Sequence, residues 1–245
     1  MKNRTVICHF YNEEYLLPWW LNHHKNIFSH GLMINYGSTD ESVEIIKRLC
    51  PTWEIVDTRN EYFGAIEIDQ EIQDYEKDIE GQRIVLNVTE FLIGNFSKIE
   101  NTNADLLIGS ASMVDGPNLN TEYPDTEQPL TSQRMWGQDP FKRLSSGARL
   151  LHSNQNIRYP IGRHYWNVPI TDDFMILRYK HSPWNDHFIK RKMQIAGKQP
   201  ASDLARGWGN HHQLDEAGLE EEKLTYFNTA EDLSSIIKKY EYWSY

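Results

Sequence analysis

Apolar residues along the first hundred positions gather in short runs that alternate with amphipathic stretches. The runs, such as TVICHF at residues 5–10, are rich in β-branched residues, as is typical of strands buried on both faces. The stretches between them carry apolar residues at helical spacing, for example Val43, Ile46 and Leu49. We predict strands at residues 5–10, 31–34, 53–56, 83–86 and 105–108, and helices at residues 15–26, 42–49 and 64–79.

Strands separated by helices of this length imply βαβ crossovers and a mostly parallel sheet. Such sheets bind ligands beyond the carboxyl ends of their strands, so the segments just after each strand are expected to carry the site. The second half is less regular. It has a long polar loop at residues 115–133, a strand at 173–179 and helices at 184–196 and 230–240. We expect one α/β domain, with residues 1–110 and 111–245 as its two halves.

Composition excludes several classes of protein. The chain has 25 Lys and Arg against 35 Asp and Glu, a net charge of −10, which argues against a general nucleic-acid binder. No apolar run approaches the roughly 20 residues of a membrane span. The two cysteines, Cys8 and Cys50, are too few for a disulfide scaffold or a zinc site and favour a reducing cytoplasm.

Several motifs resemble those of a known family. HFYNEEYLLPWWLNHH at residues 9–24 and INYGSTDES at 34–42 resemble the start of family 2-like glycosyltransferases, which have the GT-A fold. LNVTEFLIG at 86–94 stands where those enzymes carry an Asp-x-Asp motif, and GRHYW and LRYKHSPWNDHFIKRK resemble a C-terminal pattern of a related group. The resemblance covers about residues 4–215. It implies a GT-A, Rossmann-like sheet flanked by helices, with nucleotide-sugar binding in the first half and acceptor binding in the second.

The resemblance also implies an activity. A sugar would pass from a nucleoside-diphosphate sugar, with UDP as the expected nucleotide, to a glycan or glycolipid acceptor. Peripheral contact with a membrane would suit a glycolipid acceptor and the basic stretch at residues 187–192. The rival hypothesis is a non-catalytic relative that binds a nucleotide sugar or glycan, because several expected acids are replaced.

The loop after the first strand offers groups suited to a nucleotide. Phe10, Tyr11 and Asn12 combine a flat apolar face with polar edges for a base, and Glu14 could accept hydrogen bonds from a ribose diol. The alternative is that Glu13 and Glu14 are first-turn acids favoured by the helix dipole.

Three residues after the next two strands are further candidates for nucleotide-sugar binding. Asn35 stands where related enzymes have Asp, and its amide oxygen could accept a uracil N–H without the assistance of a charge. Asp40 is either a ligand contact or a helix cap. Arg59 either meets a phosphate or is a solvated surface residue.

The segment expected to bind a metal ion has fewer acidic residues than the motif of the family it resembles. Asn87 and Thr89 face one side, where they could contact the nucleotide sugar, but neither is charged, and only Glu90 is a carboxylate. Mn²⁺ and Mg²⁺ prefer hard anionic oxygens. Three interpretations follow: Glu90 holds a metal ion with help from His164, the enzyme works without a metal ion, or the site is catalytically inactive. His164 has a purely structural role as its alternative.

An inverting transfer needs a carboxylate base, whereas a retaining one does not. We take Asp173, at the start of a predicted strand, and then Asp139, among aromatic residues, as the candidates, with a turn or cap role as the alternative for both. The hypothesis as a whole predicts that Tyr11, Asn35 and Glu90 face one shared cleft.

Overall fold

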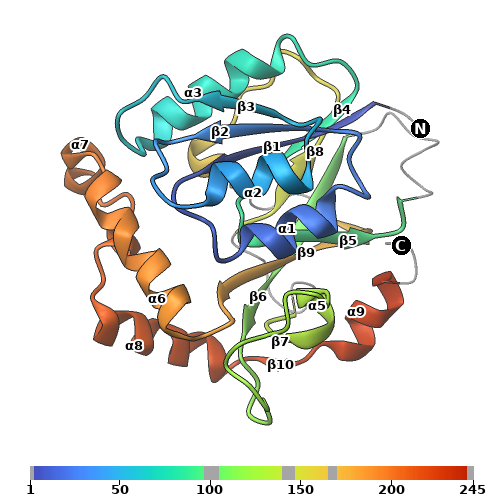
Figure 1. Ribbon diagram of the computed structural model, residues 1–245, viewed down its shortest axis with the longest axis vertical. Helices are drawn as coiled ribbons and strands as arrows, with labels where there is room; N and C mark the ends of the chain where they lie inside the picture. Colours follow the sequence, from blue (N-terminus) through green and yellow to red (C-terminus); the bar gives the residue numbers. More distant parts are fainter. Residues whose placement is uncertain (1–2, 97–104, 140–146, 165–169, 242–245) are drawn as a thin grey trace.

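The computed structural model describes residues 3–96, 105–139, 147–164 and 170–241. It confirms the predicted α/β class (Figure 1). The first half forms a four-stranded parallel sheet in the order β3-β2-β1-β4. The strands are β1 (Arg4–Phe10), β2 (His30–Asn35), β3 (Glu54–Asp57) and β4 (Gln82–Val85). The helices are α1 (Leu17–His24), α2 (Ser42–Leu49) and α3 (Ala65–Glu76).

Alternation along β1 sets the two faces of this sheet. Val6, Cys8 and Phe10 belong to the larger core cluster, which also contains the buried apolar residues of α1 and α2. Ile7 points the other way, into a smaller cluster with Ile72 of α3 and neighbouring residues of β2 and β4. Successive side chains of a strand point to opposite faces, so the continuous apolar run is explained by helices on both sides.

The second half adds a mixed sheet in the order β10-β7-β6-β9-β5, with β8 paired to β6. Its strands are β5 (Glu90–Gly94), β6 (Leu106–Val114), β7 (Trp136–Gly137), β8 (Arg149–Leu151), β9 (Thr171–His181) and β10 (Glu231–Asp232). The strand predicted at 105–108 is thus β6, and it belongs to this sheet rather than to the parallel one. Of the pairings in this sheet only β6–β9 is parallel, and an isolated bridge from Arg83 to His152 joins the two sheets.

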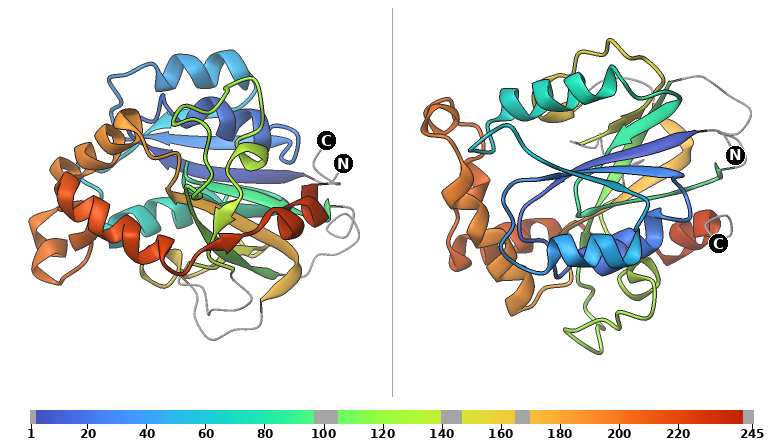
Figure 2. Two further views of the ribbon diagram at one scale, coloured as in Figure 1. Left: turned by 90° about the horizontal axis from the view of Figure 1, so that it is seen from below. Right: turned by 45° about the horizontal axis from the view of Figure 1, so that its top comes forward.

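Short helices of the second half lie at the side where the parallel strands end (Figures 1 and 2). They are α6 (Asp186–Met193), η2 (Gln194–Lys198), α7 (Ala201–Ala205), η3 (Asn210–His212) and α8 (Glu216–Phe227). The remaining elements are α5 (Leu130–Gln133), at the end of the predicted long loop, η1 (Ile161–Arg163) and α9 (Ser234–Glu241). The helices predicted at 184–196 and 230–240 correspond to α6 with η2 and to α9.

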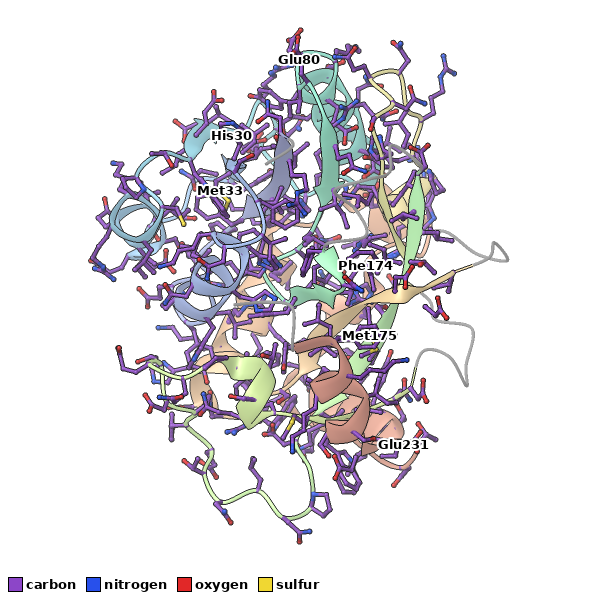
Figure 3. The ribbon with its side chains drawn as sticks, turned by 90° about the vertical axis from the view of Figure 1, so that its right-hand side faces the viewer. His30, Met33, Glu80, Phe174, Met175 and Glu231 are labelled. Atoms are coloured by element: carbon purple, nitrogen blue, oxygen red, sulfur yellow. The ribbon has the colours of Figure 1, made fainter. Side chains whose placement is uncertain are left out.

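Met33 of β2 and Phe174 and Met175 of β9 show how the core joins the two sheets. All three lie within the body of the molecule, whereas Glu80 lies at its tip (Figure 3). Both cysteines are buried free thiols. Within the described ranges, no helix has the length and apolar character that crossing a bilayer requires.

Candidate functional site

A cavity of about 410 Å³ lies at the carboxyl ends of β1 and β4. One side comes from the first half: the end of β1, the turn between β4 and β5, and the first turns of α3. The other side, which we call the second-half wall, comes from β8, η1, β9, α6 and the segments up to η3. Its polar lining residues are Arg149, Arg163, His164, Arg178, Lys180, Arg191, Lys192, Gln199, Asp203, His211 and His212. The site predicted at the ends of the parallel strands therefore coincides with a real pocket.

Glu90, at the start of β5, is fully buried beneath this pocket. Arg149 donates to its two carboxylate oxygens through Nε and Nη2, at 2.7 to 3.2 Å, and the backbone N–H of Asn87 donates to Oε2 at 2.9 Å. Burial alone would raise the pKa of Glu90, but Arg149, Arg178 and this backbone N–H hold it at about 2. Glu90 is therefore a buried, ionised counter-ion.

Arg178 lies directly opposite Glu90 in the antiparallel pair of β5 and β9. Its Nε is 3.8 Å from Oε1 of Glu90, and it donates no hydrogen bond to any residue in the described part of the chain. Its side chain lines the pocket and is 19% exposed. Arg149, in contrast, uses its remaining nitrogen to bond the carbonyls of Gly162 and Arg163. Of the two arginines at Glu90, Arg178 is therefore the one with N–H groups left for a ligand.

Two lysines of the second-half wall share one further carboxylate. Lys180 donates to Glu222 of α8 at 2.5 Å and to the Tyr226 hydroxyl at 3.0 Å. Lys192 is 3.6 Å from the other oxygen of Glu222. Burial lowers the pKa of Lys192 to about 7, and the charges of Lys180, Arg191 and Arg178 add to this effect. The lysine pair, like the arginine pair, has more positive than negative charge.

The other ionic groups of the pocket are balanced one to one. Arg191 binds both carboxylate oxygens of Glu13, and Arg163 binds Asp69, whose second oxygen accepts the N–H of Gly162. The carboxylate of Asp203 accepts the first N–H of α3 at 2.8 Å and lies 3.9 Å from the guanidinium of Arg206. Among these described groups, the excess positive charge therefore lies with the two arginines that share Glu90 and the two lysines that share Glu222.

Part of the pocket lining is aromatic. Phe63 packs edge-on to Tyr11, with ring centroids 6.1 Å apart, and stacks on Tyr36 at 4.5 Å. Lys198 places its ammonium 4.6 Å from the centre of the Tyr11 ring. Phe10, Tyr11, Asn87 and Thr89 all line the pocket, as predicted for nucleotide-sugar contacts. Their roles as contacts stay a prediction.

Four other predicted contacts, Asn12, Glu14, Asn35 and Asp40, do not line the pocket. They belong to two segments, residues 11–14 and 35–42, that we call the motif loops. Asn12 accepts the N–H of Thr39, Glu14 accepts that of Glu41, and Asp40 accepts those of Ser42 and Glu14. Asn35 accepts the N–H of Ser38 and donates to Asp57. These side chains tie the motif loops together.

The remaining predicted contact, Arg59, also lies elsewhere. It is 58% exposed, pairs with Asp74 at 3.6 Å and stacks over Tyr75. The prediction that Tyr11, Asn35 and Glu90 face one shared cleft is therefore wrong. Tyr11 lines the pocket, whereas Asn35 is bonded within its turn and Glu90 lies beneath the pocket.

The two predicted bases, Asp139 and Asp173, do not line the pocket either. Asp173 stands five residues before Arg178 on β9, which at about 3.3 Å per residue is roughly 16 Å away. After the larger effect of burial, both aspartates raise the pKa of Tyr240 on α9, so they lie near that residue instead. Their role as bases finds no support in this arrangement.

The side chains around the predicted metal ligands Glu90 and His164 do not fit a divalent cation. His164 lines the pocket, but its Nδ1 is 3.4 Å from Nη1 of Arg149. Burial, followed by the charges of Arg149 and Arg178, lowers the pKa of His164 to about 3. Glu90 is occupied by the same two guanidinium groups, which would repel a cation. Among the described residues, no three His, Cys, Asp or Glu side chains form a metal site. The roles predicted for Glu90 and His164 as metal ligands therefore lack support.

Comparison with known proteins gives no matching family model and no curated protein of significant sequence similarity. Among solved structures, the chain is similar to S. aureus TarS 1-349 in complex with UDP-GlcNAc (12% identity, TM-score 0.40, 89% of this chain and 70% of that one). It is also similar to HddC from Yersinia pseudotuberculosis (15%, 0.32, 47% and 60%). A third is the nucleoside-diphosphate-sugar pyrophosphorylase from Vibrio cholerae RC9 (13%, 0.33, 90% and 87%). At these values the likeness is one of fold alone, so the pocket must carry any assignment of function.

Proposed function

We propose that the chain binds a nucleoside-diphosphate sugar, with a UDP-sugar as the first candidate, and transfers the sugar to a glycan or glycolipid acceptor. One observation carries this proposal. A single pocket at the ends of the parallel strands is lined both by aromatic rings, those of Tyr11 and Phe63, and by incompletely compensated cations, Arg178 and Lys192.

This pairing matches the chemistry of such a donor. A nucleobase needs a flat apolar surface, and Tyr11 and Phe63 supply two rings. A diphosphate needs positive charge that is not already neutralised, and Arg178 and Lys192 supply it. The volume of about 410 Å³ lies within the ordinary range of small-molecule sites.

The alternative, a non-catalytic binding relative, is favoured by a different observation. The pocket carboxylates of the described residues are all engaged: Glu13 by Arg191, Asp69 by Arg163, and Asp203 by the first N–H of α3. Because the oxygens of these carboxylates are already occupied, an inverting transfer would have to release one of them before it could accept the acceptor's proton.

Incubation with a panel of UDP- and GDP-sugars, with and without glycan acceptors, tests the proposal. We expect release of nucleotide from at least one donor and transfer of its sugar. Binding without release across the panel would favour the non-catalytic alternative, and no binding of any nucleotide sugar would reject both.

A variant tests the aromatic part of the lining. Tyr11→Ala should weaken binding of the preferred nucleotide sugar by about tenfold, because base stacking contributes on the order of 1–3 kcal/mol. Its affinity for pyrophosphate, which has no base, should not change. Tyr123→Ala, at an exposed tyrosine outside the pocket, is the matched control. Equal loss for both ligands would remove Tyr11 from the base site.

We further propose that the acceptor is presented at a membrane surface by peripheral contact, in the cytoplasm. Ile161 lines the pocket and is exposed, and the exposed Tyr62 and Ile66 are sequence neighbours of lining residues. The buried free thiols of Cys8 and Cys50 suit a reducing compartment. Co-sedimentation with anionic lipid vesicles should be lost in the triple variant with Ser at Tyr62, Ile66 and Ile161.

A further inference from the structure

The charges of the second-half wall do not cancel. Arg149 and Arg178 share Glu90, and Lys180 and Lys192 share Glu222, so four cations face two carboxylates. Uncompensated charge is costly to bury, and such an excess is retained where a ligand of opposite charge completes it. With Lys192 protonated the excess is two positive charges, which the two negative charges of a diphosphate diester would balance.

Within this group, three side chains have capacity left for an anion. Arg178 donates no hydrogen bond to any described residue, although its side chain is only 19% exposed. Within the described ranges, Lys192 donates only to the carbonyl of Lys180, at 3.2 Å, and lies 3.6 Å from Glu222. Lys180 stands two residues from Arg178 on β9, so the two project from the same face of the strand.

Glu90 makes this arrangement possible. It occupies the position where an acidic motif would hold a metal ion, yet its oxygens are taken by Arg149, and its partner across the strand pair is Arg178. The carboxylate of Glu90 thus fixes the guanidinium of Arg149 by hydrogen bonds and attracts that of Arg178, which lines the pocket.

We propose that Arg178, Lys180 and Lys192 bind the diphosphate of the donor directly, without a divalent metal ion, and that Glu90 positions Arg178 for this task. The inference rests on the proposed function for the identity of the ligand, but the anion site itself can be tested without a nucleotide sugar. Bidentate hydrogen bonds from guanidinium to phosphate, and point charges from ammonium groups, stabilise the same oxygens that a metal ion would otherwise bind.

Titration with inorganic pyrophosphate by calorimetry, in buffer stripped of divalent cations by a chelating resin, tests the site. We expect binding in the stripped buffer, and a change in affinity of less than about threefold when Mn²⁺ is added. Arg178→Gln should weaken binding by at least about tenfold, since a charged hydrogen bond is worth roughly 1.5–3 kcal/mol. Arg48→Gln, at an exposed arginine of α2, should bind as the unmodified protein does.

Lys192→Gln is the second variant, because Arg178→Gln could disturb the buried Glu90. It should also weaken pyrophosphate binding, with Lys47→Gln, at an exposed lysine, as its control. Circular dichroism and thermal unfolding establish which variants are folded. Binding that requires Mn²⁺, or unchanged binding in a folded Arg178 or Lys192 variant, would overturn the inference.

The two proposals fail in different ways. Metal-free pyrophosphate binding with no binding of any nucleotide sugar would leave the anion site standing and reject the proposed function. Binding and turnover of a nucleotide sugar only with Mn²⁺ would support the proposed function and reject the metal-free site.

Discussion

The motif loops and the second-half wall lie on two sides of the pocket, and they differ in how far their polar side chains are already hydrogen-bonded or ion-paired within the protein. In the motif loops, side chains such as Asn12, Asn35 and Asp40 bond to neighbouring backbone N–H groups and to one another. In the second-half wall, Arg178 and Lys192 remain only partly compensated. These polar side chains of the motif loops therefore act as a scaffold, whereas the cations of the second-half wall face the pocket.

The difference has a physical cause. A loop that must hold one shape satisfies its own hydrogen-bonding groups, because an unsatisfied buried group costs about 1–3 kcal/mol. A binding site keeps some groups unsatisfied until the ligand arrives. Substitutions can test this comparison, and we expect their effects on stability or binding to be larger in the second-half wall than in the motif loops.

The largest effect should come from Glu90→Gln. This change leaves Arg149 and Arg178 in the protein without their carboxylate, and breaking a buried pair from one side costs about 3–5 kcal/mol. Urea unfolding measures this loss in the free energy of unfolding. Glu54→Gln, at an exposed position of β3, is the control and should change it by less than about 0.5 kcal/mol. A loss for Glu90→Gln as small as that of the control would mean that Glu90 is not the counter-ion.

The pH dependence of this effect has a definite sign. The pKa of Glu90 is lowered from an ordinary value of 4.5 to about 2. Its stabilisation is therefore fully present above about pH 4.5 and is lost as the pH falls towards 2. The difference in unfolding free energy between the unmodified protein and Glu90→Gln should shrink over the same interval.

A smaller effect is expected from the titration of Lys192. Since its pKa is about 7, it is charged below that pH and increasingly neutral above it. Binding of a nucleotide sugar, whose diphosphate favours the charged form, should weaken from pH 7 to pH 9 by up to about tenfold per pH unit. Calorimetry over this range measures it.

Lys192→Arg keeps the charge at every pH in this range and should flatten the profile. A profile that stays equally steep in this variant would assign the titration to another group.

The first half of the fold could be predicted because its signals are local. The run TVICHF and the helical spacing of Val43 and Ile46 depend only on near neighbours, and β1 and α2 appear where expected. The helix α8 was not predicted. Its apolar residues form no continuous stripe, and Leu219 is its one buried residue.

The candidate site could be located but not assembled from sequence. Its position followed from the rule that ligands bind beyond the ends of parallel strands. Glu90 and Arg178 are 88 positions apart in the chain, and their pairing depends on the register of β5 and β9. No local pattern encodes that register, so Glu90 was interpreted through its neighbours as a metal ligand. Arg149, on the short strand β8, carried no motif at all.

The smallest effect should come from the motif loops, with Asp40→Asn. Asp40 accepts the N–H of Ser42 at the start of α2 and that of Glu14 in the other loop, both at 3.0 Å. Asn offers a single acceptor oxygen, so one of these two N–H groups loses its partner, and the free energy of unfolding should fall by about 1 kcal/mol, a usual net value for one hydrogen bond. Glu44→Gln removes a charge from the same first turn of α2 without these bonds and is the control. If Asp40 contacts the ligand, as its motif predicts, Asp40→Asn should instead weaken nucleotide-sugar binding while stability is kept. Measuring unfolding by urea and affinity by calorimetry on the same samples separates a scaffold from a contact, because only the first outcome lowers stability at constant affinity.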